Sequence, residues 1–364
     1  MANDMEHGHG GNPPTAWERL APVIDLATPM AMRAAATLRI ADILVDGPLP
    51  VDGLARRAGV ELEALTRLMR LLTAHGVFME ARPGTFGLNS LAELLRADHP
   101  SGMRTQLDLD AFGGRMDLAF TGIMHTLRSG QPAFESIFGA TFWEYLSANP
   151  AMSEGFDAMM ASAPEYVDDV VSGYDWPDLG HIIDVGGGTG ALLAAILETN
   201  PGARGTVVDL PDTARRAGDH LASRGLGDRC DVVGQSFFDP LPTFSDATDV
   251  TYVLSNVQHD WPDGDAVAIL RRCRDAAVAG DGHGRVVIVE GPGSADDPAK
   301  EDSAREGDSG FAEMNLRMLV FVGGRQRRVG EYATLAEAAG LTVTGTTTTS
   351  LDQVVIDCRP IATA

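Results

Sequence analysis

One stretch of the chain, from His181 to Leu210, joins two apolar runs through a turn rich in glycine. The first run ends at Asp184, a helical pattern starts at Ala191, and the second run ends at Asp209. The turn holds Gly186, Gly187, Gly188 and Gly190. This order of strand, glycine turn, helix and strand is that of the nucleotide-binding half of a Rossmann-like sheet. Because glycine lets a backbone approach a ligand and the second acid can bind ribose hydroxyls, the stretch predicts a nucleoside cofactor.

The glycine spacing alone leaves the cofactor open. Gly186, Gly188 and Ala191 satisfy the dinucleotide pattern, so NAD is permitted. An acid directly before the glycines, at Asp184, and some 180 residues of another module ahead of the strand argue against NAD.

The composition is that of a globular protein large enough for two domains. The chain has 364 residues, of which 44% are hydrophobic, and a formal net charge of -23. That charge would repel a phosphate backbone, so we expect no nucleic-acid partner. No apolar run is long enough to cross a bilayer and the first residues hold no apolar signal core, so we expect a cytoplasmic protein without membrane contact. Cys230, Cys273 and Cys358 are widely spaced and predict buried free thiols.

The N-terminal hundred residues show the pattern of a winged helix. A long helical pattern runs from Pro22 to Leu44, a short helix is led by Val51 and Asp52 and broken at Gly59, and a second covers 62–75. A strand at 77–80 and a hairpin follow, so DNA binding has to be considered.

The charges of the candidate recognition helix do not favour DNA. Arg67 and Arg70 are accompanied by Glu61 and Glu63, and the surrounding residues are net acidic. The apolar first helix instead favours a module that packs against a second copy of the chain.

The residues from about 101 to 174 form a second helical segment. Its aromatic and methionine side chains are as compatible with a core as with a wall for a flat apolar substrate. Trp143, Met159 and Met160 are the candidates for such a wall.

Beyond Asp209, strands and helices alternate, which predicts a parallel sheet with helices on both faces. We expect helices at 212–223 and 264–277 and strands at 231–234, 249–254 and 285–290. Because ligands bind at the carboxyl ends of such strands, the residues just past those ends should converge on one crevice. They are Asp184 to Gly190, Asp209, Leu210, Ser236, Phe237, Ser255 to His259, and Glu290.

Five motifs in this order resemble a known family. They are DVGGGTG at 184–190, VVDLP at 207–211, SFFDPLP at 236–242, LSNVQHDWPD at 254–263 and VVIVEGPG at 286–293. Together with the winged-helix module they resemble the S-adenosylmethionine-dependent small-molecule O-methyltransferases, and most of all the bacterial enzymes that tailor aromatic polyketides such as anthracyclines. The resemblance covers nearly everything from Pro22 to the C-terminus.

The resemblance implies an α/β fold: a Rossmann-like class I methyltransferase sheet preceded by a mainly α-helical winged-helix dimerisation domain. We expect a disordered tail at 1–15, which is rich in Gly, His and Asn, then the dimerisation domain at 16–100, a helical pocket segment at 101–178 and the catalytic domain at 179–364. S-adenosylmethionine would be the cofactor, a phenolic, polyketide-like aromatic the substrate, and a homodimer the working form. No metal-ligand spacing is visible.

The resemblance also assigns roles to single residues. His259 would be the general base, and Glu290 would hold and polarise it. The expected cofactor residues are Asp184, Gly186, Gly188, Asp209, Leu210, Ser236, Phe237 and Ser255. The expected substrate pocket adds Asn256, Asn315 and Met318 to Trp143, Met159 and Met160. The alternative for His259 is a structural histidine hydrogen-bonded to Asp260.

The chemistry is consistent with these roles. A phenol has a pKa of about 10 and imidazole one of about 6.5, so the proton transfer costs about 5 kcal/mol before the site acts. A sulfonium charge close to the developing phenolate offsets much of this.

Three features depart from the family's pattern. Ser236 stands where an Asp is usual, Gln326 stands where many relatives have a second supporting glutamate, and 294–310 reads as a mobile acidic loop. Because one branch of these relatives performs hydroxylation or decarboxylation, such a reaction is the alternative to methyl transfer. A ligand-responsive DNA-binding regulator is the alternative of another class.

Overall fold

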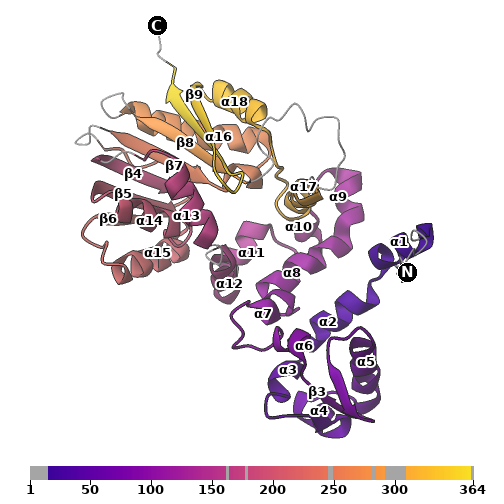
Figure 1. The fold of residues 1–364 in the computed structure, drawn as a ribbon. Coiled ribbons are helices and arrows are strands. Elements are labelled where there is room, and N and C mark those ends of the chain that lie inside the picture. The colour runs from indigo at the N-terminus through magenta and orange to yellow at the C-terminus, as the bar shows by residue number, and fades with distance from the viewer. Residues whose placement is uncertain are drawn as a thin grey trace, which may run out of the picture. The chain divides into compact units, whose positions relative to one another are not determined.

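The computed structural model describes residues 15–160, 164–176, 179–244, 249–279, 284–291 and 309–361 (Figure 1). It divides into two compact units between Arg115 and Met116. The predicted tail, apart from residue 15, and most of the predicted loop at 294–310 lie outside the described residues. The domain boundaries at residues 100 and 178 stay predictions.

The first unit is mainly helical. A three-stranded sheet in the order β1-β3-β2 completes it. Its helices are α1 (Ala16–Ile24), α2 (Ala27–Thr37), α3 (Ile40–Ile43), α4 (Val51–Ala58), α5 (Leu62–Ala74), α6 (Ser90–Glu93) and α7 (Met103–Leu107), and its strands are β1 (Leu49–Pro50), β2 (Met79–Arg82) and β3 (Thr85–Gly87).

The single helix expected from Pro22 to Leu44 is wrong, because the chain breaks there twice. Asp25 is extended, and its carboxylate accepts the Ala27 backbone N–H at 3.0 Å, which starts a new helix. Arg39 has a φ of 55°, a left-handed conformation that interrupts the helical backbone between α2 and α3.

The two short helices and the hairpin are confirmed. Gly59, with a φ of 70°, ends α4, and the Glu61 carboxylate accepts the Ala64 N–H at 2.7 Å to cap α5. Leu65, Met69 and Leu72 recur at helical spacing and are buried, so they hold α5 in the core of this unit. The strand expected at 77–80 begins two residues later, at the start of β2.

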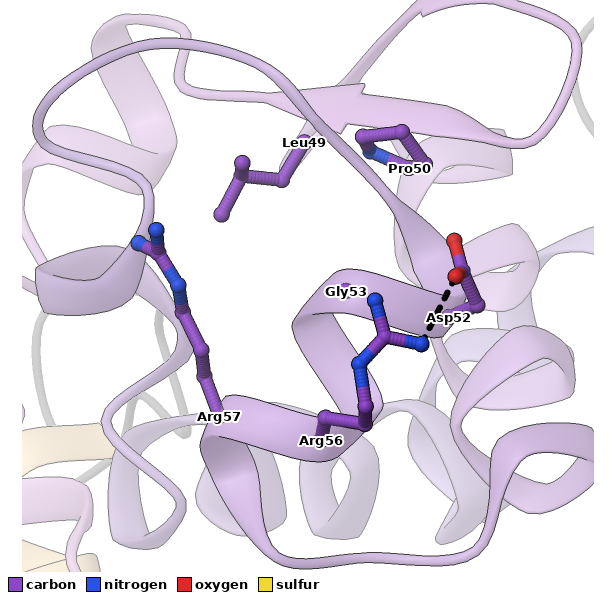
Figure 2. Close-up of a pocket in the computed structure, with 6 residues that line it drawn as sticks. All are labelled: Leu49, Pro50, Asp52, Gly53, Arg56 and Arg57. Carbon is purple, nitrogen blue, oxygen red and sulfur yellow. Dashed lines mark hydrogen bonds and ion pairs between the residues drawn. The ribbon is translucent and has the colours of Figure 1, made fainter.

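The first unit also carries a hollow with a volume of about 400 Å³ (Figure 2). Arg56 pairs with Asp52 at 2.9 Å across one side of it, and both side chains are largely exposed. None of the predicted site residues lines this hollow, so it does not mark the expected active site. The lining residues are Leu49, Pro50, Asp52, Gly53, Arg56 and Arg57.

The second unit begins within α8, which crosses the boundary, and continues through short helices into a seven-stranded sheet. The leading elements are α8 (Phe112–Ala119), η1 (Phe120–Gly122), α9 (Ile123–Ser129), α10 (Ala133–Phe138), α11 (Phe142–Ala148), α12 (Pro150–Met160) and α13 (Pro164–Gly173). The sheet order is β6-β5-β4-β7-β8-β10-β9. The strands are β4 (Leu179–Val185), β5 (Gly202–Asp209), β6 (Cys230–Gly234), β7 (Val250–Ser255), β8 (Arg285–Glu290), β9 (Leu341–Thr348) and β10 (Val354–Pro360).

The five predicted strands pair in parallel, as expected. The last two, β9 and β10, were not predicted, and they add to the sheet in antiparallel register. The remaining helices are α14 (Ala191–Thr199), α15 (Pro211–Ser223), η2 (Gln258–Asp260), α16 (Asp263–Ala279), α17 (Ser309–Phe321) and α18 (Val329–Ala338).

Helices cover both faces of the sheet (Figure 1), and each face buries its own apolar layer. Since successive side chains of a strand point to opposite faces, Ile182 and Val253 pack under α13 and α14, whereas Ile183 and Leu254 pack under α16 and α18. Cys273 and Cys358 are buried thiols as predicted, but Cys230 is only partly buried. The alternation aligns the carboxyl ends of β4, β5, β7 and β8 along one edge.

Candidate active site

The glycine turn after β4 needs glycine for two reasons. Gly186, Gly188 and Gly190 have φ values of 72°, 57° and 75°, in the left-handed region that side chains disfavour. A Cβ on Gly186 would lie 2.8 Å from Cγ2 of Val257, and one on Gly187 would lie 2.6 Å from the Asp184 carboxyl carbon. The turn therefore brings bare backbone against the acid that precedes it.

Asp184 is a buried carboxyl group whose only approaching donor in the described residues is the Leu193 backbone N–H, which opposes the rise of its pKa weakly. It is 2% exposed, and neither carboxylate oxygen makes a hydrogen bond of ordinary geometry to the described residues. Burial, and then the nearby Asp209 carboxylate, raise the pKa of Asp184 to about 7. A buried carboxylate without a well-placed donor is stabilised by a proton or by a cationic ligand, and the cradle is suited to the second.

Asp209, at the end of β5, is oriented by backbone donors. Its Oδ2 accepts the Gly188 N–H at 2.9 Å, and its Oδ1 accepts the Leu210 N–H at 2.7 Å. Burial raises the pKa of Asp209 to about 6 although these donors oppose the shift. Each oxygen keeps a second lone pair, so the group can still accept hydrogen bonds from two hydroxyls.

The turn after β6 places an aromatic ring at the glycines. A Cβ on Gly186 would lie 3.4 Å from Cε1 of Phe237, whose ring also contacts the Trp261 ring edge to face at 5.8 Å. The Ser236 hydroxyl accepts the Phe238 N–H at 3.2 Å, so it stabilises its own turn.

His259 and Glu290 come together at the end of β8. His259 lies in η2, and its Nδ1 is 2.6 Å from Oε2 of the fully buried Glu290. The other oxygen of Glu290 accepts the N–H groups of Gln258 at 3.0 Å and His259 at 3.3 Å. The Nε2 of His259 lies 3.5 Å from Asp260 Oδ1, so both partners considered from the sequence are present.

Opposing influences act on the His259 imidazole. Burial by itself lowers its pKa, but the Glu290 and Asp260 carboxylates outweigh burial and raise the pKa to about 9. If Nδ1–H donates to Glu290, the neutral ring presents Nε2 as its acceptor. This ring can therefore take a proton at Nε2 and share the resulting charge with two acids.

Arg327, which the sequence did not single out, holds the turn that carries His259. Its guanidinium is fully buried and donates to the backbone oxygens of Gln258 at 2.7 Å and Trp261 at 2.6 Å, and to Asp263 Oδ1 at 2.8 Å. A Cβ on Gly324 would lie 2.1 Å from the His259 carbonyl oxygen. The segment between α17 and α18, which carries both Gly324 and Arg327, therefore packs closely on the turn of His259.

Tyr166 and Trp261 were also missed. The Tyr166 hydroxyl is 2.6 Å from Ser255 Oγ at the end of β7, and the Trp261 ring stacks on Trp143 at 5.9 Å with an angle of 14° between planes. Trp261 follows His259 in the HDW run, which is a usable sequence signal. Tyr166 lies 89 residues from Ser255, and nothing local connects them.

The predicted pocket residues are only partly gathered. Both indole N–H groups of the stacked pair, Trp143 and Trp261, are buried without a partner among the described residues. Asn315 Oδ1 accepts the Gln326 N–H at 3.1 Å, and the Asn256 N–H donates to Val289 at 2.9 Å. Three other candidates differ in burial: Met318 is buried, Met159 is half-buried, and Met160 is 53% exposed.

The described residues lack two kinds of feature. They contain no group of three or more His, Cys, Asp or Glu side chains placed to hold a metal ion. Within the same ranges, no helix is both long and apolar enough to span a membrane.

Family models match most of the chain. Residues 120–342 match the O-methyltransferase domain, and residues 24–98 match the O-methyltransferase dimerisation domain. The chain belongs to the O-methyltransferase family.

Two curated relatives have long alignments with the chain. It is 42% identical to 2,7-dihydroxy-5-methyl-1-naphthoate 7-O-methyltransferase of Streptomyces carzinostaticus over 89% of this chain and 92% of that protein. It is 39% identical to aclacinomycin 10-hydroxylase of Streptomyces purpurascens over 93% of this chain and 89% of that protein.

A solved structure supports the same family and cofactor. It is an O-methyltransferase from neocarzinostatin biosynthesis in complex with S-adenosylmethionine and 2-hydroxy-5-methyl naphthoic acid, 40% identical to this chain. The TM-score is 0.81, and the alignment covers 93% of this chain and 98% of that one. The predicted family, fold class and cofactor are confirmed, and the self-packing module predicted from the sequence is the family's dimerisation domain.

Proposed function

We propose that this protein transfers a methyl group from S-adenosylmethionine to a phenolic hydroxyl of an aromatic natural product, with His259 as the general base. The observation that carries the proposal is the 2.6 Å contact between His259 Nδ1 and Glu290 Oε2. This contact lies at the carboxyl ends of the parallel strands, where the glycine turn also lies. A histidine oriented by a buried acid is suited to proton removal.

The cradle at the ends of β4 and β5 fits the cofactor. The unpartnered Asp184 carboxylate suits the cationic methionine end, and the oriented Asp209 suits the two ribose hydroxyls. Phe237, packed against Gly186, supplies an apolar surface for the adenine. When bound, S-adenosylmethionine supplies a methyl group on a positively charged sulfur, which is the electrophile of the reaction.

The chain's own part is to remove the phenol proton and hold the oxygen in place. A base with a pKa of about 9 accepts a proton from a phenol with a pKa of about 10 at a cost of about 1.4 kcal/mol. The free site is then mostly protonated at neutral pH. A cation held in the cradle disfavours that proton, so His259 becomes available as a base when the site is loaded.

The relatives and the Trp143–Trp261 stack support a flat aromatic substrate. One relative is named for a dihydroxylated naphthoate, and a solved relative holds a hydroxynaphthoic acid. In this chain both stacked rings carry indole N–H groups without a partner in the described residues, and Trp261 follows the proposed base by two residues. These donors suit the oxygens of a polyketide-like aromatic.

Hydroxylation is the second candidate. Its support is the 39% identity to the aclacinomycin hydroxylase. The His259–Glu290 pair favours methyl transfer, because removal of a phenol proton gives this pair a defined task.

Calorimetric titration tests the cofactor part of the proposal. We expect binding of S-adenosylmethionine and S-adenosylhomocysteine and none of NAD. Tight NAD binding without a response to the other two would replace the proposal with a dehydrogenase.

The base assignment is tested with His259→Ala on a phenolic substrate such as a hydroxynaphthoate. We expect kcat to fall by more than about tenfold across pH 6 to 9 with little change in cofactor affinity. A smaller loss would show that His259 is not the base.

We also propose that the protein works in the cytoplasm, where S-adenosylmethionine is made. Fractionation of the producing cells, with the protein recovered alongside cytoplasmic markers, is the test.

A further inference from the structure

Tyr166 lies at the cofactor edge of the sheet although it belongs to a helix far from the glycine turn in sequence. Its hydroxyl is 2.6 Å from the Ser255 hydroxyl, and either oxygen can be the donor. Ser255 ends β7, which lies between β4 and β8 in the sheet. The pair of hydroxyls therefore lies between the strand ends that carry Asp184 and Glu290.

The sheet register places this hydroxyl pair on the same face as Asp184. Asp184 pairs with Val253, and Ser255 follows Val253 by two residues, so all three side chains share one face. Tyr166 packs against the apolar layer of this face, which includes Ile182 and Val253. Glu290 follows Val289, which pairs with Ser255, so the Glu290 side chain points to the opposite face, which bears the apolar layer beneath α16.

Two acids of the site, Glu290 and Asp184, act on the Tyr166 hydroxyl. Burial raises the pKa of Tyr166, and the Glu290 and Asp184 carboxylates raise it further despite the hydrogen bond to Ser255. The phenol thus stays neutral at any working pH and keeps its proton as a donor.

A second contact fixes the helix that carries Tyr166. Three residues further along α13, the buried Asp169 accepts hydrogen bonds from the hydroxyls of Thr349 and Ser350 and from the Leu351 N–H. These residues form the turn between β9 and β10. The turn lies at the same end of the sheet as the end of β8, so α13 is anchored there. Tyr166 is held in place before any ligand arrives.

Two hydroxyls that share one hydrogen bond use only one of their two hydrogens. The other hydrogen is left for an acceptor, and the adjacent Asp184 carboxylate is left for a donor. A group that carries both a carboxylate and an ammonium, such as the amino-acid end of S-adenosylmethionine, matches this pairing.

We propose that Tyr166, through its hydrogen-bonded pair with Ser255, is a positioning residue that binds the carboxylate of the cofactor's methionine end while Asp184 binds its ammonium. This assignment rests on the proposed function. It extends the cofactor site to α13, an element outside the glycine turn and its flanking strands.

The test compares two ligands that differ only at the amino-acid end. S-adenosylhomocysteine carries the group, whereas 5′-methylthioadenosine has the same nucleoside without it. For Tyr166→Phe we expect the Kd of S-adenosylhomocysteine to rise about tenfold and that of 5′-methylthioadenosine to stay within about twofold, as measured by calorimetry.

Tyr174→Phe is the matched control. Its hydroxyl donates to Asp357 Oδ2 at 2.7 Å and lies 3.2 Å from Arg285, the first residue of β8, so it belongs to the opposite edge of the sheet. Loss of this hydroxyl should leave both Kd values unchanged. Ser255→Ala should resemble Tyr166→Phe, and the double variant should lose little more than either single one.

Two results would overturn the assignment. One is parental affinity of Tyr166→Phe for S-adenosylhomocysteine. The other is an equal loss of both ligands, which would mean that the hydroxyl only ties α13 to β7. In either case the parent still binds the cofactor and the proposed function stands, whereas a parent that binds neither ligand removes both proposals.

Discussion

At the scale of single residues, the site depends on two carboxylates in different environments. Glu290 is fully buried and has partners for both oxygens, whereas Asp184 is nearly as buried and has none in the described chain. The first is therefore suited to hold the proposed base, His259, and the second is suited to bind a cationic ligand. Burial alone does not separate these roles, but the presence of donors does.

Removal of the Glu290 charge should move the pH dependence of the reaction. Glu290→Gln takes away the larger of the two charges that raise the pKa of His259, and burial then lowers that pKa. We expect the rising limb of kcat/KM against pH to shift to lower pH, with at least a tenfold lower plateau. Asp260→Asn, which removes the acid 3.5 Å from Nε2, should shift it less. If the rising limb of kcat/KM against pH is unchanged in both variants, the titration of His259 does not control it.

Arg327 should be needed for the position of His259. Arg327→Met leaves the carbonyl oxygens of Gln258 and Trp261 without their donor, which costs on the order of 3 kcal/mol of folding stability. We expect kcat to fall more than tenfold while the Kd of S-adenosylmethionine changes little, by kinetics and calorimetry. Arg325→Met is the control, because Arg325 pairs with the same Asp263 from a partly exposed position. Equal behaviour of the two variants would contradict the role.

At the scale of elements, the ends of helices are fixed by side chains from distant segments. Arg229 donates to four backbone oxygens at the end of α14 and the start of β5: Leu197, Asn200, Pro201 and Ala203. A helix C-terminus carries unpaired carbonyls and a partial negative charge, so one guanidinium satisfies both. This contact holds the helix that follows the glycine turn against the strand that bears Asp209.

Arg229→Ala should destabilise the second unit by about 1–3 kcal/mol, because partly buried carbonyls lose a charged donor. The measurement is the shift of the thermal or urea midpoint. Arg224→Ala is the comparison: within the described residues the Arg224 side chain pairs with Glu198 at the surface, and its loss should cost less than about 1 kcal/mol. Equal shifts would show that Arg229 is not a cap.

At the scale of the whole molecule, a buried histidine makes stability depend on pH. His181 lies in β4, donates to or accepts from Thr206 at 2.8 Å and stacks on Phe244 at 3.7 Å. Burial lowers its pKa from the ordinary 6.5 to about 4. The unfolded chain therefore binds a proton between these values and the folded chain does not, so this contribution is complete above pH 6.5 and is lost as pH falls toward 4.

The check is the urea midpoint of the parent and of His181→Gln at pH 8 and at pH 5. We expect the parent to lose more stability between the two than the variant does. Comparison of the two chains at each pH cancels the acids that titrate in the same range. An equal loss would assign the pH dependence to other groups.

The local order of the catalytic domain followed from the sequence, because the glycine turn, the strand periodicity and the acids at strand ends are short-range patterns. They were sufficient for five strands and for the residues at the strand ends, whereas the family and the pairing of His259 with Glu290 came from the resemblance of five motifs to known enzymes. The breaks at Asp25 and Arg39 were missed because one hydrogen bond and one left-handed residue outweigh an apolar helical pattern.

Other features were decided only by the tertiary structure, because they depend on contacts between residues far apart in the chain. Strands β9 and β10 join the sheet in antiparallel register, and α13 is anchored through Asp169. These contacts bring Tyr166 to Ser255, 89 residues away, and Arg327 to the turn of His259. Sequence periodicity assigns a residue to a face of its own element, whereas the packing of elements decides which faces meet.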